Sequence, residues 1–175
     1  SEGWDVGIEQ SFLGDRVTAS LTYFRQATRN QIDFAWPAGY INIARTRSKG
    51  IEAGLLVTPA DWLSIDANYT HVSSVDRDTG LDLARVPKNA ANVTATLRPI
   101  APLTLAVAAR YRGQQTDSYG VTDAFVRFDL RAAYKLDDTI ELYGRIENLF
   151  DKKYQEVYGY GTPGISAYAG IRGRF

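Results

Sequence analysis

The sequence contains no cysteine and no methionine, and its one histidine is His71. Without cysteine, neither a disulfide framework nor a thiolate metal site can form. One histidine cannot build a zinc site by itself, so the sequence predicts no metal site and no cofactor. His71 shares its parity with the apolar residues of its segment, which favours a residue at the rim of a sheet over a ligand.

Net charge and long apolar runs are also missing. Lysine plus arginine and aspartate plus glutamate each number 20, so there is no electrostatic basis for nucleic-acid binding. The most apolar run, residues 100–109, is interrupted by Pro102 and Thr104, and a membrane-spanning helix needs about 18 uninterrupted apolar residues. No serine lies in a recognisable nucleophile context, so we expect no catalytic residues and no enzyme.

Alternation of apolar and polar residues is what the sequence does contain. In the last segment, every second residue is apolar or small: Ala167, Ala169, Ile171, Gly173 and Phe175 have odd numbers, that is, one parity. The residues of the other parity are mostly polar. Such alternation is typical of β-strands, and an aromatic carboxyl terminus is typical of transmembrane barrels. The pattern predicts nine strands, at residues 3–12, 17–25, 41–57, 63–71, 91–98, 103–111, 124–134, 140–148 and 165–175.

The connections between these segments alternate in length. The short ones are Leu13–Arg16, Thr58–Trp62, Arg98–Pro102 and Lys135–Thr139; the long ones are Gln26–Tyr40, Val72–Ala90, Arg112–Asp123 and Leu149–Gly164. Alternation alone also fits a soluble barrel, but strict alternation of short turns and long loops is typical of outer-membrane barrels. The sequence therefore predicts an all-β, antiparallel transmembrane barrel.

The strand number is odd, and the first strand would start on the long-loop side. Complete bacterial barrels usually have an even number of strands and both ends in the periplasm. We therefore expect residues 1–175 to form the C-terminal portion of a larger barrel. A strand missed near Ile32–Trp36 is the alternative.

Two motifs lie near the carboxyl end. The run RIENLFDKKY supplies Asn148, Leu149, Phe150, Asp151 and Tyr154, and the closing strand supplies Gly164, Tyr168, Gly170 and Phe175. Both motifs resemble the TonB-dependent outer-membrane receptors. GIEAGL at 50–55 and RVPKNAAN at 85–92 also resemble family segments, although Asn89 stands where histidine is common.

The resemblance implies the last nine strands of a barrel of about 22, in the outer membrane of a Gram-negative cell. It also implies uptake of a scarce ligand such as a ferric siderophore, haem, cobalamin or another metal chelate. The implied partners are outer-membrane lipid, the remaining barrel strands, a plug domain, the TonB system reached through an N-terminal region, and the barrel assembly machinery. The plug and the first strands have no counterpart in this sequence.

Three residue groups are candidate sites. Aromatic residues in or beside the long connections, if exposed, could stack on a ligand: Trp36, Tyr40, Tyr119, Phe125, Tyr158 and Tyr160. Charged residues of the polar parity form either a lumenal ladder of ion pairs or a wall that faces the plug: Arg127, Asp129, Arg131, Arg145, Glu147, Arg172 and Arg174. By resemblance, Tyr168, Gly170 and Phe175 form the assembly signal, which Gly173 could weaken.

Two other functions stay open at this point. One is a barrel in the outer membrane that binds a ligand or has a structural role without transport. The other is a soluble β-barrel binding protein, in which the apolar face would point inward.

Overall fold

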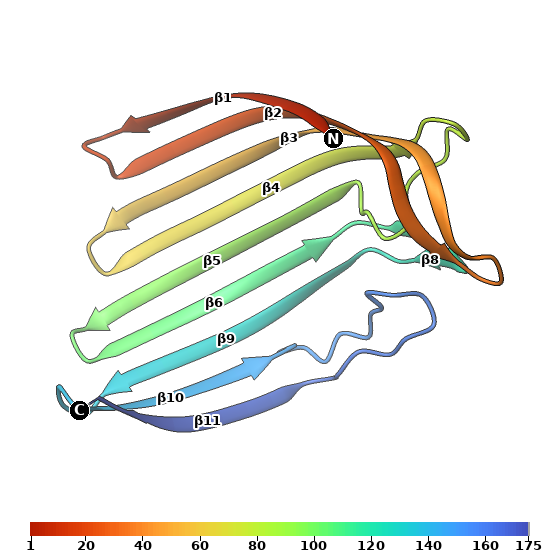
Figure 1. Cartoon of the computed structure of the whole chain (residues 1–175). Coiled ribbons are helices and arrows are strands. Elements are labelled where there is room, and N and C mark those ends of the chain that lie inside the picture. Colours follow the sequence, from red (N-terminus) through yellow and green to blue (C-terminus); the bar gives the residue numbers. More distant parts are fainter. Residues whose placement is uncertain (175) are drawn as a thin grey trace.

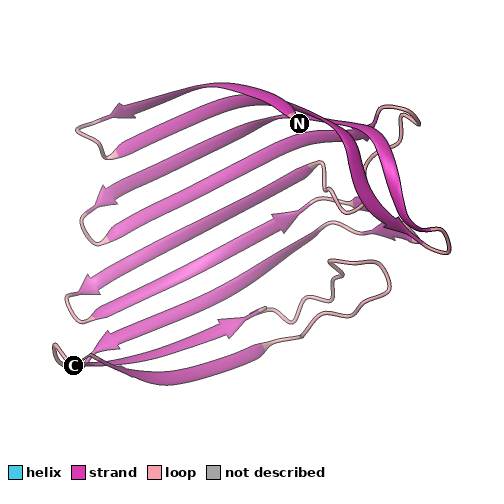
Figure 2. Cartoon of the chain, in the orientation of Figure 1, coloured by secondary structure: helices cyan, strands magenta, loops and turns pink. Residues whose placement is uncertain are grey.

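The computed structural model of the chain describes residues 1–174, apart from the side chains of residues 31, 33, 35 and 42–44. Phe175, a predicted assembly-signal residue, lies outside the described residues. Nine strands form one antiparallel sheet in chain order (Figures 1 and 2). They are β1 (Glu2–Phe12), β2 (Val17–Ala35), β3 (Gly39–Ala60), β4 (Leu63–Asp76), β5 (Asn89–Ile100), β6 (Leu103–Arg112), β9 (Phe125–Lys135), β10 (Ile140–Glu147) and β11 (Ser166–Gly173).

All four predicted short turns lie at one end of the sheet and the long connections at the other (Figure 1). The nine predicted strands are therefore confirmed. Two additional strands, β7 (Gln115–Asp117) and β8 (Gly120–Thr122), pair as a small hairpin within the connection between β6 and β9.

The prediction of a loop at Gln26–Tyr40 is wrong. β2 and β3 continue as a long hairpin whose strand pairing reaches Ala35 and Gly39, with Trp36 in the turn. Residues 32–35 belong to β2, so the alternative of a missed strand there is also wrong. The remaining long connections, after β4, β6 and β10, are loops as predicted.

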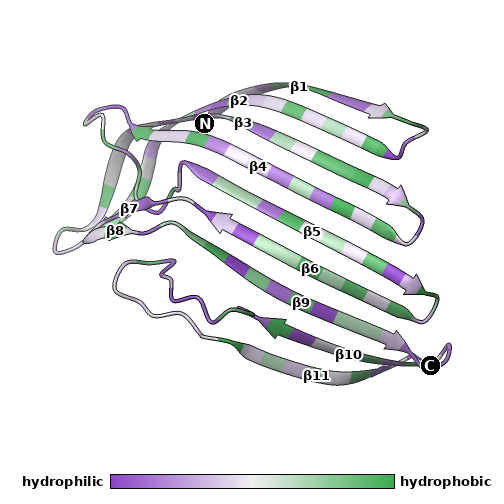
Figure 3. Ribbon diagram, turned by 180° about the vertical axis from the view of Figure 1, so that it is seen from behind, coloured by the Kyte–Doolittle hydropathy of each residue, from purple (hydrophilic) through white to green (hydrophobic). Residues whose placement is uncertain are grey.

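The register places apolar side chains in continuous rows, because directly paired residues point to the same face of a sheet. One row crosses all nine strands without a polar residue: Phe12, Val17, Val57, Ile65, Ala95, Val107, Leu130, Ile146 and Ala167. We call this side the apolar face. The other side, the polar face, carries rows such as Glu9, Ser20, Gly54, Asn68, Asn92, Arg110 and Arg127. Figure 3 shows the resulting alternation along the strands.

The apolar face is not covered by other parts of the described chain. Val6, Ile8 and Ile171 are 62%, 69% and 72% exposed, and Phe125 is the one apolar side chain of the described residues in the buried class. In a soluble sandwich the apolar side chains would be buried against a second sheet. An apolar face without such cover fits contact with lipid. Among the described residues, no helix is both long and apolar enough to cross a membrane.

Candidate functional site

Three connections at the long-loop end meet at the carboxylate of Asp117 in β7. Arg85, from the β4–β5 connection, places Nε 3.2 Å and 3.1 Å from the two carboxylate oxygens. The backbone N–H groups of Ser118 and Tyr158 donate to the same carboxylate at 2.6 Å and 3.1 Å. The side chain of Asp117 is 1% exposed. The hydrogen bond from Arg85, together with those from the two backbone N–H groups, holds the pKa of Asp117 below its usual value.

Further contacts join the β7–β8 hairpin to the connection between β10 and β11, which we call the terminal loop (residues 148–165). Gln115 donates from Nε2 to the carbonyl oxygen of Glu156 at 2.8 Å. The ring of Tyr158 covers Gly120, so that a Cβ atom at Gly120 would lie 2.4 Å from the ring. Only glycine permits this close packing, and the terminal loop is thereby fixed against the hairpin.

A pocket of about 550 Å³ opens between the terminal loop and the segment that leads into β9. Phe125, Tyr154 and Tyr158 contribute aromatic surface, and Lys152 and Lys153 contribute positive charge. The remaining lining residues are Val121, Asp123, Ala124, Gln155, Gly161 and Thr162. Aromatic rings and ammonium groups in one pocket can bind an anionic ligand that has planar groups.

One wall of the pocket is fixed by contacts to the polar face of β9. The rings of Phe125 and Tyr154 stack with centroids 4.2 Å apart. Arg127 donates to the Tyr154 hydroxyl oxygen at 3.0 Å and to Asp129 at 2.8 Å. Asp129 in turn accepts the backbone N–H of Asn148 at 2.9 Å. Hydrogen bonds therefore connect the terminal loop, including Tyr154 in the pocket wall, to Arg127 and Asp129 of β9.

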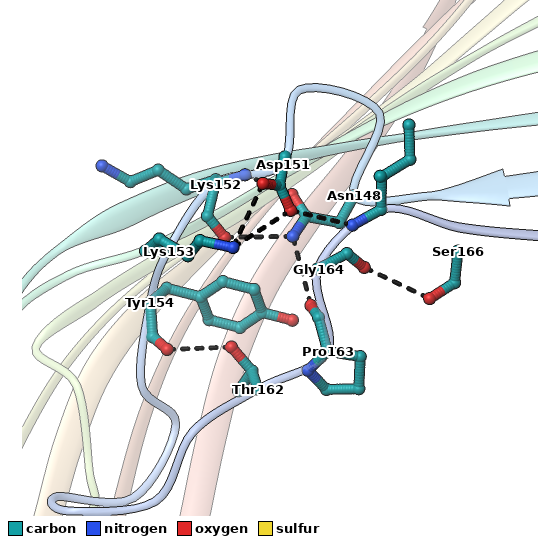
Figure 4. A network of polar contacts seen from close by, with 10 residues as sticks. Asn148, Asp151, Lys152, Lys153, Tyr154, Thr162, Pro163, Gly164 and Ser166 are labelled. Carbon is teal, nitrogen blue, oxygen red and sulfur yellow. Dashed lines mark hydrogen bonds and ion pairs between the residues drawn. The ribbon is translucent and has the colours of Figure 1, made fainter.

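Asn148 closes the base of the terminal loop (Figure 4). Its side chain is buried, and Nδ2 donates to the carbonyl oxygens of Lys152 at 3.0 Å and Pro163 at 3.2 Å. Oδ1 accepts the backbone N–H of Lys152 at 2.8 Å. The residue has φ of 52°, a left-handed conformation that asparagine tolerates better than most residues.

Asp151 fixes the other end of the same loop. Its carboxylate accepts the backbone N–H of Ile165 at 3.0 Å and pairs with Lys153 at 3.1 Å. The Ile165 N–H group, together with Lys153, lowers the pKa of Asp151. Asn148, Asp151 and Tyr154 of the recognised run thus shape the loop.

The predicted ligand-contact aromatics are only partly brought together. Phe125 and Tyr158 line the pocket, whereas Trp36, Tyr40, Tyr119 and Tyr160 are 72% to 82% exposed and lie outside its lining. Phe125 does not meet the condition of exposure, since it is 4% exposed and Tyr154 stacks on it. Sequence reasoning did not single out Lys152, Lys153 or Gln155, although Tyr154 and its loop were recognised.

Five of the seven predicted charged residues form ion pairs on the polar face. Arg127 pairs with Asp129 at 2.8 Å, Arg145 with Glu147 at 3.2 Å, and Arg172 with Glu141 at 2.7 Å. Arg131 lies directly opposite Arg145 in the register, and Arg174 lines a hollow beside the last short turn. A continuous lumenal ladder of ion pairs and contact with a plug both remain predictions.

The two described assembly-signal residues lie on the polar face of β11. The guanidinium of Arg145 lies 4.4 Å from the ring centroid of Tyr168. Gly170 faces Tyr143, and a Cβ atom at Gly170 would lie 2.4 Å from the Tyr143 hydroxyl oxygen. A ring that covers a glycine on the neighbouring strand helps to fix the strand register. Recognition by the assembly machinery remains a prediction.

His71 lies at the end of the apolar face, on the long-loop side. Its Nδ1 and the Tyr69 hydroxyl both lie within hydrogen-bond distance of Oδ1 of Asn89, at 2.8 Å and 2.7 Å. These contacts agree with the interpretation of His71 as a rim residue. The described residues hold no group of three or more histidine, cysteine, aspartate and glutamate side chains that could bind a metal ion.

The chain is similar to known receptors and transporters. It is 28% identical to a probable TonB-dependent siderophore receptor, PiuA, of Acinetobacter baumannii over 88% of its length, and 25% identical to the ferric enterobactin receptor PirA of Pseudomonas aeruginosa over 98%. It is 40% identical to the vitamin B12 transporter BtuB of Vibrio vulnificus over 92%. The chain spans 23% to 27% of the lengths of these relatives.

Solved structures show the same fold. The copper transporter OprC matches 98% of the chain with a TM-score of 0.82 at 18% identity, and this match covers 31% of OprC. The ferric enterobactin receptor PfeA of Pseudomonas aeruginosa matches 98% with a TM-score of 0.81 at 24% identity, and this match covers 30% of PfeA. The family model of the TonB dependent receptor-like β-barrel matches residues 1–149. The chain therefore belongs to the TonB-dependent receptor β-barrel family.

Proposed function

We propose that this chain is the C-terminal part of the barrel of an outer-membrane receptor that imports a scarce ligand, with the long loops on the extracellular side. A ferric siderophore is the ligand class we favour over haem and cobalamin. The observation that carries this choice is the pocket between the terminal loop and β9, where Lys152 and Lys153 accompany three aromatic rings. The ferric complex of a siderophore with three catecholate groups has a net negative charge, which is complementary to the two lysines.

The family relationship supports transport over a purely structural barrel. The relatives include receptors and transporters of siderophores and vitamin B12. The uncovered apolar face supports a membrane location over the soluble-barrel alternative. In this proposal the plug and the first barrel strands are supplied by regions outside this sequence, and the TonB system is reached through an N-terminal region.

The test is ligand binding by the intact receptor that carries this sequence. Ferric enterobactin and cobalamin are titrated separately into the purified receptor in detergent. We expect ferric enterobactin to bind, and the double substitution Lys152→Gln/Lys153→Gln to weaken binding at least about tenfold. One charge-assisted contact of about 1.5 kcal/mol already corresponds to roughly tenfold in affinity. The control is Lys135→Gln/Arg98→Gln, at the short-turn end. If both double variants bind ferric enterobactin with the affinity of the parent receptor, the pocket is not the site that binds it.

A further inference from the structure

A cluster of positive charge lies on the apolar face, directly beyond its apolar rows on the long-loop side. Tyr23 and Ile51 pair across β2 and β3 and line an apolar hollow with Val6, Ile8 and Leu21. Two residues closer to the hairpin turn on each strand, Arg25 lies directly opposite Lys49 in the register. Side chains two residues apart in a strand point to the same face, so both cations share the face that carries Tyr23 and Ile51.

The cluster continues along β3. Arg47 lies two residues beyond Lys49 on the same face, which is about 7 Å along the strand. We call Arg25, Arg47 and Lys49 the rim cluster. Arg29 and Arg45 lie directly opposite each other in the register, two residues beyond Ala27 and Arg47 towards the hairpin turn.

Acidic side chains do not neutralise the rim cluster within the described part of the chain. None of its three cations forms an ion pair there, whereas Arg45 is hydrogen-bonded to Asp78 at 3.0 Å. Glu2 is on the same face of β1, opposite Ala27, and makes no ion pair with Arg25. Like charges directly opposite each other in a sheet are destabilising, so Arg25 and Lys49 would both gain from a shared anion.

The neighbouring aromatic rings indicate the depth of the cluster in a membrane. Trp4 pairs with Arg25 across β1 and β2, and its ring centroid lies 5.4 Å from that of Tyr23. Tryptophan and tyrosine are enriched at the level of the lipid headgroups. The rim cluster therefore lies at the level of the headgroups, next to an apolar surface that acyl chains can contact.

We propose that the rim cluster binds the phosphate groups of a phosphorylated lipid of the outer leaflet, whose acyl chains pack on the hollow formed by Val6, Ile8, Leu21, Tyr23 and Ile51. Arginine binds phosphate through two N–H groups at once, and lysine binds it as a compact charge. This site lies on the face opposite to the polar residues of the strands, so it does not depend on the ligand that the receptor imports.

The experiment measures lipid binding by native mass spectrometry on the intact receptor in detergent, with diphosphorylated lipid A as the probe. One cation near a lipid surface contributes about 1 kcal/mol, or roughly fivefold in affinity. We therefore expect Arg25→Gln/Arg47→Gln/Lys49→Gln to weaken lipid A binding roughly a hundredfold. The matched control, Arg16→Gln/Arg98→Gln/Lys135→Gln, removes the same charge at the short-turn end and should bind as the parent does.

Three further arms make the result specific. Lipid A without phosphates should bind the parent receptor as weakly as diphosphorylated lipid A binds the triple variant. Arg25→Lys/Arg47→Lys/Lys49→Arg keeps the charges and should retain at least a third of the affinity, which separates loss of charge from loss of folding. Inorganic phosphate at millimolar concentration should not displace the lipid. Equal binding by the triple variant and its control, equal binding of the dephosphorylated lipid, or displacement by phosphate alone would each overturn the proposal.

Discussion

Asp117 accepts a hydrogen bond at 3.1 Å from the backbone N–H of Tyr158, which lies 41 residues further along the chain. The same carboxylate is held by Arg85 from a third connection. One buried side chain thus joins three loops at the end of the sheet that we propose to be extracellular. Since Tyr158 lines the proposed ligand pocket, the position of Asp117 bears directly on the shape of that pocket.

Substitution Asp117→Asn should loosen the terminal loop. Asparagine keeps the size of the side chain but loses the charge that pairs with Arg85. We expect faster amide hydrogen exchange at residues 154–162 in the intact receptor and unchanged exchange in the strands. Asp15→Asn is the matched control, because Asp15 is exposed in the first short turn and makes no ion pair within the described residues. Similar exchange in both variants would show that Asp117 does not hold the loop.

Acid should release the same contact. Because the folded-state pKa of Asp117 is lowered, its stabilisation is complete above the unfolded-state pKa of about 3.9 and is lost as the pH falls through the lower folded-state value. A spin label on Tyr160→Cys, in a receptor without other reactive cysteine, should become more mobile below about pH 3.9. In a background of Asp117→Asn, this part of the transition should be absent. If the change in spin-label mobility is equally large in the Asp117→Asn background, other groups cause the pH dependence, and Asp151 is the first to test because its pKa is also lowered.

Asn148 offers a test of the loop base. Asn148→Ala removes three side-chain hydrogen bonds, each of which contributes about 0.5–1.5 kcal/mol to stability. Asn148→Gly removes the same bonds but relieves the positive φ. We expect both variants to lose ligand affinity in the intact receptor, alanine more than glycine, with the barrel still folded. Parent-like affinity in both would show that the loop keeps its shape without this side chain.

Gly170 should be far more sensitive to substitution than Gly144. Gly170→Ala places a methyl group against Tyr143, and overpacking of this kind costs about 1–3 kcal/mol. The nearest atom to a Cβ at Gly144 is a backbone oxygen at 3.5 Å, an ordinary contact. Thermal unfolding of the intact receptor in detergent should show a lower midpoint for Gly170→Ala only. The double variant Gly170→Ala/Tyr143→Ala should recover part of the loss, and no recovery would mean that Tyr143 is not the cause.

The strands were predictable because their side chains follow a period of two, and the register confirmed the apolar row from Phe12 to Ala167. Residues 26–30 show no such period, and the alternation at Ile32, Phe34 and Trp36 is too short to predict that β2 continues into it. The β7–β8 hairpin was missed because three-residue strands carry too little pattern.

The candidate site was less predictable than the fold, because its contacts join residues far apart in the sequence. Phe125 is buried by Tyr154, 29 residues away, and local sequence gave no sign of that contact. Asp117 was missed for the same reason, since its partners come from two other connections. The residues around Asn148 were found through the family resemblance, whereas their hydrogen bonds became visible only in the structure.

The most direct test of the account is energised uptake by the intact receptor. Cells that lack their own catecholate receptors are given this receptor, and the accumulation of iron from radiolabelled ferric enterobactin is measured with and without an uncoupler of the proton-motive force. We predict that iron accumulation stops when the uncoupler is added, while surface binding of ferric enterobactin by the receptor persists. Deletion of residues Val157–Gly161 should lower the accumulation. Iron accumulation that is unaffected by the uncoupler would contradict the proposed function. The same holds if cells with the receptor accumulate no more radiolabelled ferric enterobactin, and no more radiolabelled cobalamin, than cells without it.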